Sequence, residues 1–147
     1  MDKHKQNIIN SIAQELDCGF DCYFNVKTEE IISIPGFSYV LDMDDFEEAF
    51  EDNFNKIENQ KSDLIKFEVL QSFESFKIME DFVAQLSDKN LQEELNLILI
   101  QKKPFRNFKY RIDHSDFRQS WFDFKQKELE KRVETELKTN KISASFW

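Results

Sequence analysis

The sequence predicts an α+β fold, in which a small antiparallel sheet of about three strands packs with about five or six helices and the C-terminal half is rich in helix. Three observations lead to this prediction. Apolar and polar residues alternate in a few short segments, whereas elsewhere apolar residues recur every three or four positions. The 147 residues include only two glycines and two prolines, which favours long helices over tight turns. Sixteen phenylalanines provide large side chains for a hydrophobic core.

The N-terminal part combines one helix with the sheet. Residues 3–16 predict an amphipathic helix, and Gly19 suits its C-terminal end. The apolar positions at helical spacing are Ile8, Ile9, Ile12, Ala13 and Leu16. Residues 20–26 and 31–34 alternate and are joined by a short turn, which predicts an antiparallel hairpin. Residues 63–70 alternate in the same way, so we expect a third strand that joins the hairpin.

Residues 42–60 predict an acidic amphipathic helix. Its apolar stripe is formed by Phe46, Phe50, Phe54 and Ile57. Asp44 or Asp45 is expected to cap it, because a carboxylate accepts hydrogen bonds from the first free N–H groups of a helix. The candidate acidic docking face consists of Asp45, Glu48, Glu51 and Asp52. These carboxylates are either a docking face for a basic partner or the solvated outer face of a packed helix.

The chain from residue 71 to residue 138 predicts a series of helices. Ser72 is expected to cap the first of them, which carries apolar residues as far as Leu86. A break follows at residues 87–90. Residues 91–100 are apolar on more than one face, and this pattern predicts the most buried helix of the fold.

Two further helices complete the prediction. Pro104 suits the first turn of a short helix, because its missing N–H would have no partner there. The residues expected on the buried stripe of this helix are Phe105, Phe108 and Ile112. Ser115 is expected to cap a last helix from Asp116 to about Lys138. The residues expected to pack that helix are Phe117, Trp121, Phe124, Leu129, Val133 and Leu137.

No repeat, linker or low-complexity run divides the chain, so one domain of residues 1–147 is expected. Residues 1–70 would supply the first helix, the hairpin, the acidic helix and the third strand. Residues 71–138 would be helical, and residues 139–147 would form a flexible tail.

The formal net charge of −9 argues against duplex nucleic acid and anionic membranes as partners. A protein partner is therefore expected, and a nucleic acid is disfavoured. No apolar run approaches the length of a bilayer span, so no membrane contact is expected. The polar start at residues 1–6 shows no signal peptide, and the expected location is cytoplasmic. The sequence does not indicate an oligomeric state.

The sequence lacks catalytic and metal-binding signatures. Residues 113–116, Asp-His-Ser-Asp, look like a compressed triad, but neighbours in sequence do not supply triad geometry, and a polar turn is expected. No glycine-rich phosphate-binding loop occurs. Cys18 and Cys22 lack the further ligands of a zinc site and are expected to be reduced thiols, and the acids of residues 42–60 lack the spacing of a calcium loop. We predict no catalytic residue, no metal and no cofactor.

The strongest candidate contact surface is basic and aromatic. Six cations fall within 17 positions of an otherwise acidic chain, namely Lys102, Lys103, Arg106, Lys109, Arg111 and Arg118. The residues predicted to bind are Arg106, Lys109, Tyr110, Arg111 and Arg118. The interpretation that follows is a small non-catalytic interaction or regulatory protein with segregated acidic and basic–aromatic faces.

Three alternatives remain open. Aromatic rings beside cations also suit RNA, single-stranded nucleic acid or a nucleotide. The cations would instead be structural if they paired with residues 42–58 while the aromatic rings filled the core. The third is a hydrolase-like enzyme with a carboxylate site, which the 29 acidic residues permit without indicating any particular pair.

Several motifs occur in an order that is typical of one family. They are Phe24-Asn25-Val26-Lys27-Thr28-Glu29-Glu30-Ile31-Ile32, Ile34-Pro35, Ser75-Phe76-Lys77-Ile78-Met79-Glu80-Asp81-Phe82, Pro104-Phe105-Arg106-Asn107-Phe108-Lys109 and Trp121-Phe122-Asp123-Phe124. On these motifs, the chain resembles the uncharacterised protein family 0158 of bacteria over roughly residues 20–135. At the hairpin turn Glu29 stands where the family often has glycine, a departure that bears on the geometry of the turn. The resemblance implies a bacterial source and supports the predicted fold, but it carries no established activity.

Overall fold

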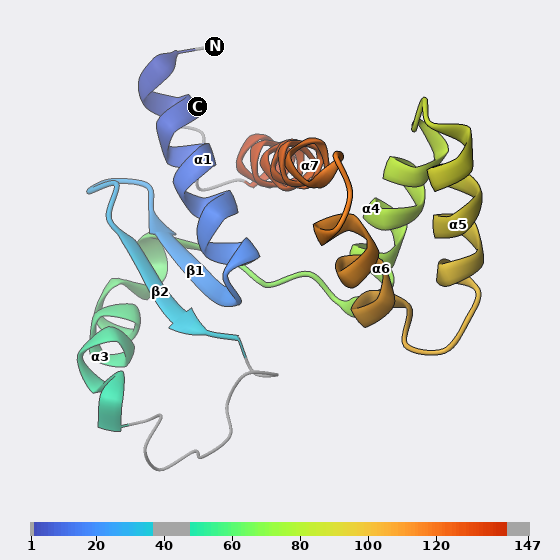
Figure 1. Ribbon diagram of the computed structural model, residues 1–147. Coiled ribbons are helices and arrows are strands. Elements are labelled where there is room, and N and C mark those ends of the chain that lie inside the picture. The colour runs from blue at the N-terminus through green and yellow to red at the C-terminus, as the bar shows by residue number, and fades with distance from the viewer. Residues whose placement is uncertain (1, 37–47, 141–147) are drawn as a thin grey trace. The chain divides into compact units, whose positions relative to one another are not determined.

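The computed structural model describes residues 2–36 and 48–140, and it confirms the α+β class (Figure 1). The described residues form six α-helices and one three-stranded antiparallel sheet. They group into two compact units: unit 1 comprises residues 1–69 and 129–147, and unit 2 comprises residues 70–128. A single domain for the whole chain stays a prediction. The tail was expected at residues 139–147; Thr139 instead ends the last helix, and residues 141–147 lie outside the described residues.

Unit 1 is built on helix α1 (Lys3–Asp17) and the sheet. Asp2 caps α1, because its carboxylate accepts a hydrogen bond from the His4 N–H at 3.0 Å. Gly19 follows the helix with φ of 94°, a left-handed conformation that glycine adopts without strain. Helix α1 packs on strand β1. Its buried face consists of the predicted residues Ile8, Ile9, Ile12, Ala13 and Leu16.

The sheet has the order β2-β1-β3, and both neighbouring pairs are antiparallel. Its strands are β1 (Phe20–Asn25), β2 (Ile31–Pro35) and β3 (Leu64–Phe67), as the alternating pattern predicted. In β1, Cys22 and Phe24 are fully buried, and in β3 Ile65 and Phe67 are buried. The third strand therefore adds to the free edge of β1, opposite β2.

The turn between β1 and β2 is fixed by Asn25 and strained at Glu29. The buried Asn25 side chain accepts hydrogen bonds from the N–H groups of Lys27 and Thr28 at 2.8 and 2.9 Å. Glu29 has φ of 65°, in the left-handed region that disfavours residues with a Cβ. This is a conformation that glycine adopts freely, so the turn keeps a glycine-like geometry although the residue is glutamate.

Helix α3 (Glu51–Gln60) covers part of the acidic segment and leads through a short 3₁₀ turn, Lys61–Asp63, into β3. The Asn53 side chain donates to the Ser33 carbonyl of β2 at 2.8 Å, which attaches α3 to the sheet. The stripe residues Phe50, Phe54 and Ile57 are half-buried. The prediction of a single helix over residues 42–60 was wrong. Residues 48–49 are helical, but Phe50 leaves the helical conformation before α3 begins. The expected positions of Asp44, Asp45 and Phe46 lie outside the described residues.

Unit 2 contains helices α4 (Ser72–Ala84), α5 (Lys89–Leu99), α6 (Pro104–Asp113) and the first part of α7 (Arg118–Thr139). Gln71 caps α4 in place of the predicted Ser72. The side chains of Gln71 and Glu74 each accept from the other residue's backbone N–H, so Ser72 is already the first helical residue. Asp88 caps α5 through the Leu91 N–H at 3.0 Å.

Helix α5 is not the most buried helix, and this prediction was wrong. Leu91, Leu95 and Leu99 form one buried stripe, whereas Leu97 is 55% exposed and Ile100 is 80% exposed. Apolar residues on two faces of a helix become buried on both only when neighbouring elements cover both faces. In α5 the neighbours α4 and α6 cover only one.

The predicted stripe of α6 holds for Phe108 and Ile112, which are buried, but not for Phe105, which is 42% exposed. Phe105 lies in the first turn, at the end of the helix, where its ring meets Phe76 edge-on at 6.2 Å between centroids. Pro104 stands at the start of α6, as predicted. Ser115 is not the N-cap of α7: it accepts from the Phe117 N–H at 3.1 Å, and the helix begins at Arg118.

The core of unit 2 is aromatic. Phe82 lies against Trp121 and Phe124 at 5.3 and 5.4 Å between ring centroids, and Phe108 lies against Trp121 at 5.0 Å. All three contacts are edge-to-face, an arrangement that aromatic pairs prefer. In unit 1, the second half of α7 buries Leu129, Val133 and Leu137 as predicted. Across the described ranges, no helix combines the length and apolar character needed to cross a bilayer.

Candidate functional site

Large apolar side chains reach solvent in unit 2. Among the described residues, those with high exposure are Phe73 at 71%, Leu97 at 55%, Ile100 at 80%, Phe105 at 42% and Tyr110 at 66%, and all belong to unit 2. Four of them lie where α4 begins, α5 ends and α6 begins, and Figure 1 shows these three helix ends together at the same end of the unit. The Phe76–Phe105 ring contact joins α4 to α6 at this end.

Cations share this end of the unit. Lys102 and Lys103 lie in the connection from α5 to α6, and Arg106 lies in the first turn of α6. We call this surface the cationic–apolar end; it consists of Phe73, Ile100, Lys102, Lys103, Phe105 and Arg106. The sequence predicted only Arg106 of this set as a binding residue. Lys102 and Lys103 were counted among the six clustered cations, and the signal for Ile100 was the second apolar face of residues 91–100, which was interpreted as burial.

The connection between α5 and α6 is locally fixed. The Asn107 side chain donates to the Lys102 carbonyl at 3.1 Å. Lys103 has φ of 54°, in the left-handed region, and Pro104 then starts the helix. Since no side chain caps α6, its first N–H groups add partial positive charge to this end.

The three cations of this end form no ion pair with any residue in the described ranges 2–36 and 48–140. Nearby acids are engaged elsewhere: the Glu74 carboxylate accepts from the Gln71 N–H at 3.0 Å, and Glu94 binds Arg111. Unit 2 contains ten Lys and Arg and ten Asp and Glu residues, so its formal charge is zero and the excess of −9 belongs to unit 1. The acidity of the whole chain therefore does not describe this surface.

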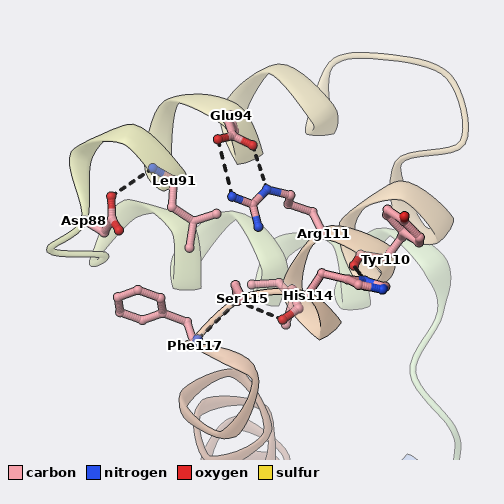
Figure 2. Close-up of polar contacts among 9 residues, drawn as sticks. Asp88, Leu91, Glu94, Tyr110, Arg111, His114, Ser115 and Phe117 are labelled. Atoms are coloured by element: carbon pink, nitrogen blue, oxygen red, sulfur yellow. Dashed lines mark hydrogen bonds and ion pairs between the residues drawn. The ribbon is translucent and has the colours of Figure 1, made fainter.

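The other predicted binding cations are held by local ion pairs. Arg111 contacts Glu94 of α5 through two nitrogens, at 2.6 and 3.4 Å, and thereby ties α6 to α5 (Figure 2). This hydrogen bonding raises the pKa of Arg111 and lowers the pKa of Glu94. Lys109 and Arg118 both pair with Asp113, at 2.9 and 3.4 Å. The hydrogen bond from Lys109, with a further contribution from Arg118, lowers the pKa of Asp113.

Cations also cover aromatic faces inside unit 2. The Arg118 guanidinium lies over the Phe122 ring at 4.5 Å, and the Lys125 ammonium lies 5.5 Å from the centroids of both Trp121 and Phe122. Tyr110 stacks on His114 with 4.3 Å between ring centroids. The alternation of cations and aromatics along the sequence is thus partly an internal packing pattern. Of the five predicted binding residues, Arg106 is the exposed cation without an ion pair in the described chain, and Tyr110 is an exposed ring.

The chain turns at His114-Ser115-Asp116, as expected. The His114 Nδ1 lies 2.7 Å from the Tyr110 carbonyl, which can only accept, so Nδ1 carries the proton (Figure 2). Ser115 donates to the Ile112 carbonyl at 2.8 Å, and Asp113 is engaged by Lys109. Each of these side chains binds a partner other than its sequence neighbours, so they do not form a triad.

The structure describes three of the four residues of the predicted acidic docking face. Glu48, Glu51 and Asp52 are exposed, and Asp45 lies outside the described residues. Glu51 and Asp52 occupy the first turn of α3, where carboxylates stabilise the positive end of the helix dipole. Their use as a docking face stays a prediction.

The described residues give no metal centre. Within them, no group of three or more His, Cys, Asp and Glu side chains converges on a common point. Both cysteines are free thiols, Cys18 exposed and Cys22 buried. Burial raises the pKa of the Cys22 thiol to about 12.

Comparison with known proteins places the chain in a family. No curated protein and no solved structure matches it at significant similarity. A family model does match, over residues 2–147, and its description is "Uncharacterised protein family (UPF0158)". The match covers nearly the whole chain and agrees with the motifs found in the sequence. The chain therefore belongs to the uncharacterised protein family UPF0158.

Proposed function

We propose that this protein is a small non-catalytic interaction protein, which binds a partner protein through the cationic–apolar end of unit 2. One observation carries the proposal: highly exposed Phe73 and Ile100 share one end of the unit with cations that form no ion pair in the described chain. Exposed apolar residues that gather at one place mark contact surfaces more often than scattered ones do.

Several features favour a protein partner over a nucleic acid. Aliphatic side chains such as Leu97 and Ile100 bury well against protein but do not stack on bases. The ring of Phe105 already contacts Phe76, and Tyr110 is stacked on His114. The formal charge of unit 2 is zero, whereas phosphate backbones select surfaces with a strong positive excess.

The test is quantitative capture from a lysate of the source organism with the tagged full-length chain. The variant Phe73→Ser/Ile100→Ser removes the two most exposed apolar side chains and should fold normally, because both already face solvent. The matched control Lys89→Glu changes an exposed residue at the opposite end of α5. A protein that is enriched by wild type and by the control, but lost with the double variant, supports the proposal.

The contrary result has two forms. If no captured protein depends on Phe73 and Ile100, the surface does not bind a protein partner. If single-stranded RNA binds at about 50 mM salt and the affinity falls steeply as salt rises, nucleic-acid binding replaces the proposed function.

A further inference from the structure

We propose that the partner presents an acidic amphipathic helix to the cationic–apolar end, with its apolar face on Ile100 and Phe105 and its carboxylates on Lys102, Lys103 and Arg106. This inference rests on the proposed function and specifies the chemistry of the partner. It follows from the kind of contact that unit 2 can offer, from the positive charge of Lys102, Lys103 and Arg106 at this end, and from the position of the apolar residues.

The described residues of unit 2 offer a partner no sheet edge for backbone hydrogen bonding. Unit 2, residues 70–128, is described throughout and contains helices and connections but no strand. An extended peptide that binds by adding to a sheet would find no edge here. A helical partner segment needs no such edge, because it satisfies its own backbone hydrogen bonds while its side chains make the contacts.

The local charge of the cationic–apolar end is positive. Arg106 lies three residues after Lys103, and no side chain caps the N-terminus of the helix that contains Arg106. On the same face of α5 as Leu97, Glu93 is an exposed carboxylate one turn farther from this end. The cations of this end thus lie in the connection and in the first turn of α6, beside the uncharged last turn of α5. Complementarity then selects a partner with carboxylates, which would meet these cations around the apolar contact.

Two exposed apolar side chains at this end, Ile100 and Phe105, can provide the apolar contact. Ile100 is 80% exposed at the end of α5, and Phe105 is 42% exposed with its ring set against Phe76. A helix with apolar residues at three- and four-residue spacing presents a stripe that can cover such side chains. Lys102, Lys103 and Arg106, which precede or follow these apolar residues closely in the chain, would pair with acids beside the stripe.

The experiment measures binding of two labelled synthetic helices to the full-length protein by fluorescence anisotropy. Both peptides carry the same leucine stripe, and the remaining positions are glutamate in one and lysine in the other. The glutamate peptide should bind and the lysine peptide should not. Ile100→Ser should weaken binding of the glutamate peptide by about fivefold or more. Lys102→Glu/Arg106→Glu should weaken it by about tenfold or more and should gain binding to the lysine peptide.

Lys89→Glu, which reverses one charge at the other end of α5, should leave the affinity unchanged. Absence of binding to the glutamate peptide, or equal binding of both peptides, overturns the inference. So does a concentration-dependent dimer in sedimentation that Ile100→Ser abolishes, because the occupant would then be a second copy of the chain.

The two proposals fail separately. A partner captured through Phe73 and Ile100, together with a negative glutamate peptide, leaves the proposed function intact and refutes the acidic helix. Loss of any surface-dependent capture refutes the proposed function, and the inference that rests on it falls as well.

Discussion

Replacement of Glu29 by glycine should stabilise the hairpin relative to replacement by alanine. Glu29 has φ of 65°, and its N–H donates to the Asn25 carbonyl at 2.8 Å, so the turn holds it in the left-handed conformation. Its carboxylate also pairs with the His4 imidazole, and the His4 side chain is 61% exposed. Two effects therefore act at one residue, backbone strain and an exposed ion pair.

The magnitudes separate these effects. A residue with a Cβ in the left-handed region costs about 1–2 kcal/mol. Glycine removes that strain but costs about 0.5–1 kcal/mol in backbone entropy. Glu29→Gly should therefore be more stable than Glu29→Ala by up to about 1.5 kcal/mol, with a central value of about 0.8 kcal/mol. Both variants lose the His4 contact, which as an exposed pair contributes about 0–1 kcal/mol, so the comparison cancels it.

The assay is urea unfolding followed by far-UV circular dichroism, with the transition midpoint compared at an unchanged slope. Lys27, in the same turn, does not have a positive φ and provides the control. There, the glycine variant should be less stable than the alanine variant, because glycine brings only its entropic cost. If Glu29→Gly is no more stable than Glu29→Ala, the left-handed backbone carries no strain at this turn and the reasoning is wrong.

Three further predictions concern unit 1. Asn25→Ala should lower the free energy of unfolding by about 1–3 kcal/mol, because the N–H groups of Lys27 and Thr28 lose their acceptor. Urea unfolding would measure this loss, and Asn7→Ala, at an exposed asparagine, is the control. In the native protein, iodoacetamide should alkylate exposed Cys18 and not Cys22, whose buried thiol has a pKa raised to about 12. Mass spectrometry would identify the alkylated cysteine, and equal labelling of both would contradict the burial of Cys22. Burial raises the pKa of Glu136, with Glu68 adding to the shift and Arg132 opposing it. The folded state therefore favours the protonated form, so stability is lost as pH rises from the ordinary value of 4.5 through the raised pKa. Glu136→Gln should be more stable than wild type near pH 7, and its advantage should shrink on acidification to pH 4; an advantage that does not vary with pH would refute the shift.

The local pattern of the sequence determined most of the secondary structure. Alternation at residues 20–26 and 31–34 predicted the hairpin, and helical spacing from Ile8 to Leu16 predicted α1 with its buried face. These predictions succeed because a repeat of two or of three to four residues decides which side chains share a face. The sequence predicted the capping residues less accurately than the helices themselves. At α4, Gln71 is the N-cap in place of Ser72, because Gln71 and Glu74 form a capping box.

The candidate site depended on the tertiary structure. The apolar face at Leu97 and Ile100 is visible in the sequence, but only the arrangement of α4, α5 and α6 shows that nothing in unit 2 covers it. Likewise, the sequence shows a row of cations, whereas the fold pairs Arg111 with Glu94 and leaves Arg106 without an ion pair among the described residues. Periodicity states which residues share a face; whether that face is buried or a charge is paired depends on elements that come close only when the chain folds.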